Sequence, residues 1–143
     1  MKLLILGDVV GTPGRDALKN KLPRIIDQNN IDFVVVNGEN AADDGRGITQ
    51  SIAEEFFLNG VDVVTSGNHI WDKQESINYI DREYKILRPA NFAEGSPGKG
   101  YEIYCSKKNK YKVGVINLMG NVFMRKTDDV FKAAQNICKK IVL

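Results

Sequence analysis

Cysteine is scarce in this chain of 143 residues, with Cys105 and Cys138 as its only two. Two isolated thiols make neither a disulfide framework nor a zinc site, and they fit a reducing compartment. No apolar run approaches the roughly 20 residues that a membrane span requires. These absences predict a soluble, cytoplasmic protein with no membrane partner.

An excess of charge of one sign is also missing, because lysine and arginine nearly balance aspartate and glutamate and leave a net charge of +2. That balance gives no reason to propose a nucleic-acid surface. Gly7, Gly11 and Gly14 lack the Gly-x-Gly-x-x-Gly spacing of dinucleotide-binding proteins, and no phosphate-binding loop with Gly-Lys-Ser/Thr occurs. An ordinary Rossmann-like nucleotide binder is therefore disfavoured.

The chain does contain a regular alternation of strand and helix patterns. Three short apolar, β-branched runs predict strands buried on both faces of a parallel sheet: residues 3–6, 33–36 and 61–65. Helix patterns lie between and after them: residues 12–29, residues 49–59, and a third helix opening with a capping box at Asp72. This order predicts an α/β fold of parallel βαβ units with right-handed crossovers.

The rest of the chain predicts smaller elements. They are a short fourth strand at residues 86–87, a hairpin of residues 101–105 and 112–118 around a solvated lysine-rich turn at 107–110, and a helix over about residues 129–140. Residues 141–143 have the character of the first residues of another strand.

Polar residues follow each of the first three predicted strands: Asp8, then Glu39 and Asn40, then Asn68 and His69. Carboxyl ends of parallel strands meet at one edge of the sheet, so these residues form one candidate site. Two carboxylates and two amides supply oxygen ligands for divalent ions such as manganese or iron. Glu39 could bridge two ions, and His69 could protonate a leaving alkoxide. Turn chemistry and a structural histidine remain the alternative interpretations.

Several longer motifs carry a family resemblance: residues 7–15 around Gly7-Asp8, Asn37-Gly38-Glu39-Asn40, Gly67-Asn68-His69, Arg88-Pro89-Ala90-Asn91, and residues 116–120 around Asn117. Over essentially the whole chain they resemble the YmdB-type branch of the calcineurin-like metallophosphoesterases. The resemblance implies that Asp8 ligates one metal ion, Glu39 bridges both ions, and Asn40 and Asn68 ligate the second, with His69 as the proton donor. It also implies phosphodiesterase activity, including hydrolysis of 2′,3′-cyclic nucleotides, with iron or manganese.

The resembled family continues for about as long again and supplies further metal-binding histidines, whereas His69 is the only histidine here. We therefore expect residues 1–143 to form a single N-terminal portion of the domain, an incomplete half of the α/β sandwich with roughly half of the ligands. The expected partners are a phosphate-ester substrate and either a C-terminal half or a second copy of the chain. The alternative is a catalytically inactive remnant or a binding module that keeps the cleft at the strand ends.

Overall fold

The computed structural model describes residues 1–108 and 110–141. Its elements are β1 (Leu3–Asp8), α1 (Gly11–Asn29), β2 (Phe33–Asn37), α2 (Gln50–Leu58), β3 (Val63–Thr65), the 3₁₀ turn η1 (Gln74–Ser76), α3 (Ile77–Arg82), β4 (Ile86–Leu87), β5 (Tyr101–Cys105), β6 (Lys112–Ile116) and α4 (Val130–Lys140). The predicted order of strands and helices is confirmed. Part of the lysine-rich turn, at residue 109, and most of the expected last strand, at residues 142–143, lie outside the described residues.

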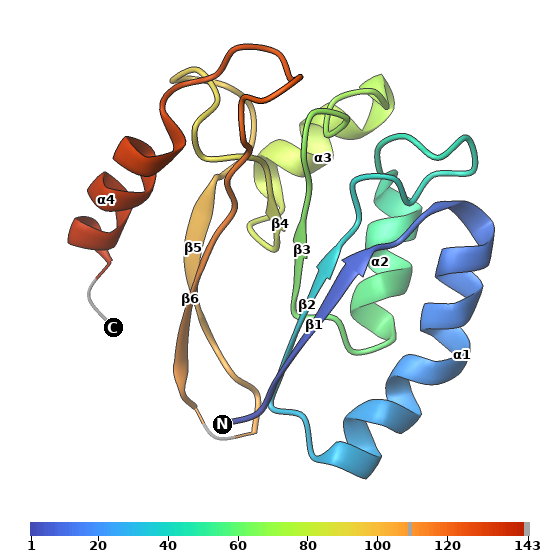
Figure 1. Ribbon diagram of the computed structural model, residues 1–143. Coiled ribbons are helices and arrows are strands. Elements are labelled where there is room, and N and C mark those ends of the chain that lie inside the picture. The colour runs from blue at the N-terminus through green and yellow to red at the C-terminus, as the bar shows by residue number, and fades with distance from the viewer. Residues whose placement is uncertain (109, 142–143) are drawn as a thin grey trace.

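Strands β1 to β4 form one parallel sheet in the order β1-β2-β3-β4. Right-handed crossovers between strands added in this order place the connecting helices on one face. Figure 1 shows α1 and α2 on that face and the antiparallel hairpin β5–β6 on the other, with α4 beyond the hairpin. The molecule is thus layered as helices, parallel sheet and hairpin, which confirms the α/β fold class.

Each face of the sheet has its own apolar core, because neighbouring side chains of a strand point to opposite faces. On the helix side, Val34 and Val64 pack in a cluster with Phe56 of α2. On the hairpin side, Phe33 packs against Tyr104, with ring centroids 5.9 Å apart. Both faces are therefore buried at the centre of the sheet, as the continuous apolar runs predicted.

Local capping signals explain where two of the helices begin. Thr49 caps α2, since its hydroxyl accepts a hydrogen bond from the backbone N–H of Ile52 at 3.3 Å, and Asp129 caps α4 in the same way through Lys132. Helix α1 instead begins at Gly11, one residue before the predicted start, with no side-chain cap. Thr12 donates its hydroxyl to Asp43 rather than capping the helix.

The outer edge of the parallel sheet is open at β1. This strand pairs only with β2 among the described strands. The side chains of Leu3 and Ile5, which share the hairpin-side face with Phe33 and Val35, are 47% and 72% exposed. An open edge and an uncovered apolar face favour association with another polypeptide, and association of this chain stays a prediction.

None of the helices in the described ranges has both the length and the apolar content for crossing a bilayer.

Candidate functional site

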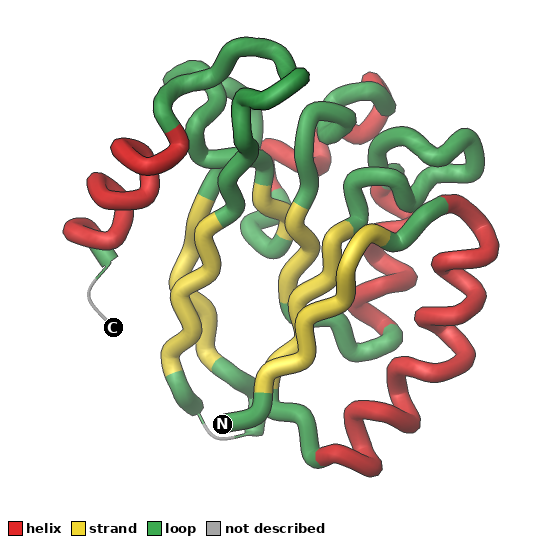
Figure 2. The backbone as a smooth tube through the Cα atoms, viewed as in Figure 1, coloured by secondary structure: helices red, strands yellow, loops and turns green. Residues whose placement is uncertain are grey.

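The loops that follow β1, β2 and β3 gather at one end of the parallel sheet (Figure 2). Asp8 is the last residue of β1, Glu39 and Asn40 lie just after β2, and Asn68 and His69 lie just after β3. The structure therefore brings the five predicted residues to a common edge, the place where open α/β sheets bind ligands. Their roles at that edge remain predictions.

A bulge in β1 decides which side of the sheet Asp8 occupies. Leu6 pairs with Val36, but the next pairing joins Asp8 to Asn37, so Gly7 is an extra residue in the ladder. An insertion of one residue moves all following side chains to the opposite face. Asp8 thereby shares the face of Asn37 instead of continuing the helix-facing series of Leu4 and Leu6.

Asp8 and Asn40 are joined directly. The side-chain amide of Asn40 donates a hydrogen bond to Oδ2 of Asp8 at 2.8 Å. This bond orients the amide with its nitrogen toward Asp8, which leaves the amide oxygen Oδ1 as the atom of Asn40 that can bind a cation. The pair thus offers oxygen ligands from two neighbouring strands.

Glu39 is held at the centre of the edge by its backbone and by its carboxylate. Its N–H donates to the side-chain oxygen of Asn37 at 3.0 Å, and its carbonyl accepts from Gly47 at 2.6 Å. Its carboxylate lies directly against the Cα of Gly67, and Oε1 accepts a long hydrogen bond from the backbone N–H of His69 at 3.4 Å. Glu39 therefore links the loop after β2 to the loop after β3.

Gly67 makes this position of Glu39 sterically accessible. A Cβ atom at residue 67 would collide with both carboxylate oxygens of Glu39. Gly67→Ala should displace the flexible carboxylate at little cost to folding, and should weaken manganese binding roughly 10- to 100-fold, because the ligand loses its support. Manganese titration followed by electron paramagnetic resonance, with a urea melt of the same protein, measures both effects.

The matched control for that substitution is Gly120→Ala, whose added Cβ would meet no atom within 4 Å. It should leave both manganese affinity and stability unchanged. If Gly67→Ala binds manganese as well as the parent protein does, the position of the Glu39 carboxylate is not important for metal binding.

The side chain of His69 pairs with Asp72, a residue that the sequence pattern predicted to cap a helix. Nδ1 of His69 lies 2.6 Å from Oδ2 of Asp72, and the side chains are 27% and 41% exposed. The prediction that Asp72 opens the third helix with a capping box is therefore wrong, because a 3₁₀ turn starts at Gln74 and α3 only at Ile77. With Nδ1 paired, Nε2 is the ring nitrogen that can face a ligand.

Asn68 is at the same edge but faces different surroundings. Its side chain forms no hydrogen bond with the other predicted site residues in the described part of the chain, and it lines a cavity with Trp71 and Phe92. Asn68 thus directly follows Gly67, which lies against the Glu39 carboxylate, and it also lines this cavity.

The loop from Ala41 to Gly47 is fastened on both sides by ion pairs. Arg15 donates to the carbonyl of Ala41 and to the carboxylate of Asp43, both at 2.6 Å, and Lys73 lies 2.7 Å from Asp44. The hydrogen bond from Arg15 lowers the pKa of Asp43 below its usual value, and the hydrogen bond from Lys73 does the same for the pKa of Asp44. These contacts position the segment that directly follows Glu39 and Asn40.

Two buried asparagines also shape the edge, and the sequence pattern assigned them no role. Asn117 donates to the carbonyls of Ser66 at 2.7 Å and Leu87 at 2.9 Å, which ties β6 to the ends of β3 and β4. Asn91 exchanges hydrogen bonds with the backbone of Met119 at 2.7 and 3.0 Å. Both stand in motifs that carry the family resemblance, but their partners are too distant in sequence to be inferred from it.

The residues present fit part of a metal site. Asp8, Glu39 and the amide oxygens supply hard donors of the kind that manganese and iron accept. However, no group of three or more His, Cys, Asp or Glu side chains suited to holding an ion occurs within residues 1–108 and 110–141. The described donors could therefore hold at most part of a two-metal centre, and metal binding by this chain stays a prediction.

Comparison with known proteins finds relatives along almost the whole of this chain. A family model described as YmdB-like protein matches residues 4–143. The 2′,3′-cyclic-nucleotide 2′-phosphodiesterase of Bacillus subtilis is 44% identical over 137 residues, which cover 96% of this chain and 51% of that protein. A putative phosphatase/phosphodiesterase of Mycoplasma pneumoniae is 31% identical, over 98% of this chain and 51% of that protein.

Solved structures give the same result for the fold. A hypothetical protein from Thermus thermophilus superposes with a TM-score of 0.90 at 34% identity, over 99% of this chain and 54% of that one. A protein described as a novel phosphatase from Mycoplasma pneumoniae superposes with a TM-score of 0.89 at 30% identity, over 99% and 52%. The chain spans about half the length of the curated relatives it matches.

Proposed function

This chain belongs to the YmdB-like family, and on that premise we propose that it contributes to a divalent-metal-dependent phosphoesterase that cleaves phosphodiesters. The names of its relatives support phosphate-ester chemistry. The name of the Bacillus subtilis relative points to 2′,3′-cyclic nucleotides as the substrate class. Residues 1–143 would form one N-terminal portion of the catalytic domain.

One observation carries the proposal: the Glu39 carboxylate is seated against Gly67, between the loop after β2 and the loop after β3. A side chain that caps a helix or stabilises a turn would not need this contact with Gly67, because it bonds to nearby backbone. A carboxylate fixed between two strand ends is well placed to serve ligands on both sides, as a bridging ligand must.

The proposed roles follow from that placement. Asp8 would ligate one ion, Glu39 would bridge two, and the amide oxygens of Asn40 and Asn68 would ligate the second, with iron or manganese as the metal. Bound ions of this kind supply Lewis-acid activation of a phosphate and of a water molecule. Further histidine ligands would come from polypeptide outside these 143 residues, since His69 is the only histidine of the chain.

His69 is the proposed proton donor to the leaving alkoxide. Asp72 holds the imidazole through Nδ1, which directs the proton transfer to Nε2. Asp72 is a positioning residue in this scheme, because it acts on the substrate only through His69.

A binding module without catalysis is the second candidate function. It is favoured by the absence, within the described ranges, of any cluster of three classical metal-binding side chains. Such a module would keep the cleft at the strand ends and bind a phosphate ester without cleaving it.

Manganese titration of the 143-residue chain tests the metal proposal. We expect at most one weakly held ion, because two carboxylates and two amides carry too little charge and too few donors for two adjacent cations. Glu39→Gln and Asp8→Asn should weaken that binding further, whereas Asp16→Asn, an exposed carboxylate on α1, should not. Two tightly held ions, or equal binding by all three variants, would contradict the proposed ligand set.

A further inference from the structure

A cavity of about 210 Å³ opens beside Asn68 at the same end of the sheet. It lies between the loops that follow β3, β4 and β6. Its principal lining side chains are Asn68, Trp71, Phe92, Met119, Arg125 and Lys126. Pockets for drug-sized ligands measure roughly 300–1,000 Å³, so this cavity has room for one ring system and not for a whole nucleotide.

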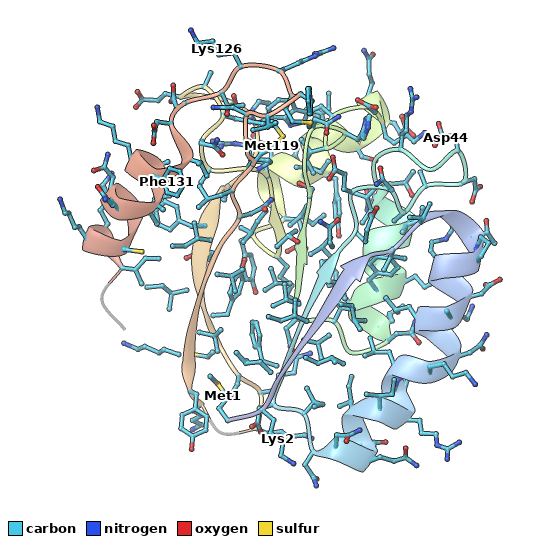
Figure 3. The ribbon with its side chains drawn as sticks, viewed as in Figure 1. Met1, Lys2, Asp44, Met119, Lys126 and Phe131 are labelled. Atoms are coloured by element: carbon cyan, nitrogen blue, oxygen red, sulfur yellow. The ribbon has the colours of Figure 1, made fainter. Side chains whose placement is uncertain are left out.

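One wall of the cavity is aromatic. The rings of Trp71 and Phe92 are tilted at 48° with centroids 5.2 Å apart, and both side chains are half-buried against the helix-side core. Met119, near the start of the loop after β6, is buried and lies below Lys126 in the view of Figure 3. Fixed rings with one accessible side give a planar ligand a surface on which to stack.

The rim of the cavity is cationic. Arg125 and Lys126 are exposed and form no ion pair with any residue that the structure describes, and Lys126 points outward from the top of the loop in Figure 3. Unpaired cations beside an aromatic wall attract a phosphate. A purely apolar ligand would make no use of these charges.

The loop that carries both cations is held in place by side-chain hydrogen bonds. Asn91 donates to Thr127 Oγ1 at 2.8 Å as well as to the carbonyl of Met119, and Asn121 accepts from the backbone N–H of Thr127 at 3.2 Å. The loop is thus braced at both ends, which lowers the ordering cost of binding a ligand there.

We propose that this cavity is a base-binding subsite for a nucleotide, with Trp71 and Phe92 as the stacking wall and Arg125 and Lys126 as the contacts for its phosphate. The inference rests on the proposed phosphoesterase function, because it assigns the substrate of that same site. Asn68 belongs to both places: it lines the cavity and follows Gly67, the seat of Glu39. A base in the cavity would therefore lie beside the loop that carries Gly67.

Trp71 is the only tryptophan of the chain, so its fluorescence reports directly on the cavity. We expect adenosine 3′-monophosphate and adenosine to quench this emission saturably in metal-free protein, excited at the red edge of the indole band where adenine does not absorb. Ribose 5-phosphate, which lacks a base, should cause no quenching.

Two sets of variants separate stacking from charge. Phe92→Leu keeps apolar volume and removes the ring. It should therefore weaken the binding of adenosine and of its monophosphate alike, roughly 5- to 100-fold. Arg125→Ala combined with Lys126→Ala should weaken binding of the monophosphate roughly 10-fold and leave binding of adenosine unchanged. Lys139→Ala with Lys140→Ala, two exposed lysines at the end of α4, is the matched control and should change neither.

The outcomes are distinguishable from failure of the phosphoesterase proposal, because neither metal nor turnover is required. No quenching by either adenosine compound, or equal quenching by ribose 5-phosphate, would overturn the base-binding subsite. Should Phe92→Leu fail to fold in a thermal melt, the exposed cation variants still decide: equal loss of adenosine and its monophosphate argues against the subsite. Base-dependent binding that is lost in Phe92→Leu would support the subsite whether or not the protein binds manganese.

Discussion

Alone, the 143 residues should show no measurable hydrolysis of bis(p-nitrophenyl) phosphate or of a 2′,3′-cyclic nucleotide, with manganese or iron added. Phosphodiester cleavage at a two-metal site needs activated water, clamped phosphate oxygens and a proton for the leaving group. In the proposed scheme these residues would supply only the last of the three, through His69, together with part of the metal ligands. General acid catalysis contributes about 10²–10⁴-fold, below the 10⁶-fold or more that enzymes supply.

The complementary half of the site should restore turnover. A suitable source is the part of the Bacillus subtilis relative that this chain does not match, about half of that protein. Mixed with the chain, it should produce metal-dependent hydrolysis that neither piece shows separately. The opposite finding would be metal-dependent hydrolysis by the chain alone that disappears in Glu39→Ala, because it would show that the present ligands suffice.

In the reconstituted enzyme, substitutions of Glu39 and His69 should have different signatures. Glu39→Ala removes a proposed ligand from both ions at once, so it should lower turnover on the order of 10³-fold and lower metal content with it. His69→Ala should leave metal content intact. It should slow hydrolysis of the cyclic nucleotide about 10²–10⁴-fold, because the alkoxide leaving group of that substrate needs a proton.

The leaving group provides the internal control. p-Nitrophenolate departs without a proton, so His69→Ala should barely affect bis(p-nitrophenyl) phosphate. Asp72→Asn should follow the His69→Ala pattern with a smaller effect. The substitution weakens the contact of 2.6 Å by which Asp72 positions the imidazole of His69. Asp16→Asn on α1 is the matched carboxylate control. Equal slowing of both substrates by His69→Ala would contradict its role as proton donor.

The sequence by itself determined the order of elements and the edge at which the site lies. Apolar runs about one βα unit apart predicted the parallel sheet, and that sheet brought Asp8, Glu39 and Asn68 to the same end. The helix predicted over residues 49–59 corresponds to α2, which Thr49 caps. These features depend on neighbours within a few residues, which a linear pattern records.

Only the tertiary structure decided how the side chains at that edge meet. The bulge at Gly7 depends on the pairing register between β1 and β2, and the seat of Glu39 against Gly67 joins residues 28 positions apart. Asp72 pairs with His69 instead of capping a helix, and Asn91 finds its partners across the fold near Met119. Such contacts follow from packing and register between distant segments, so no local pattern contains them.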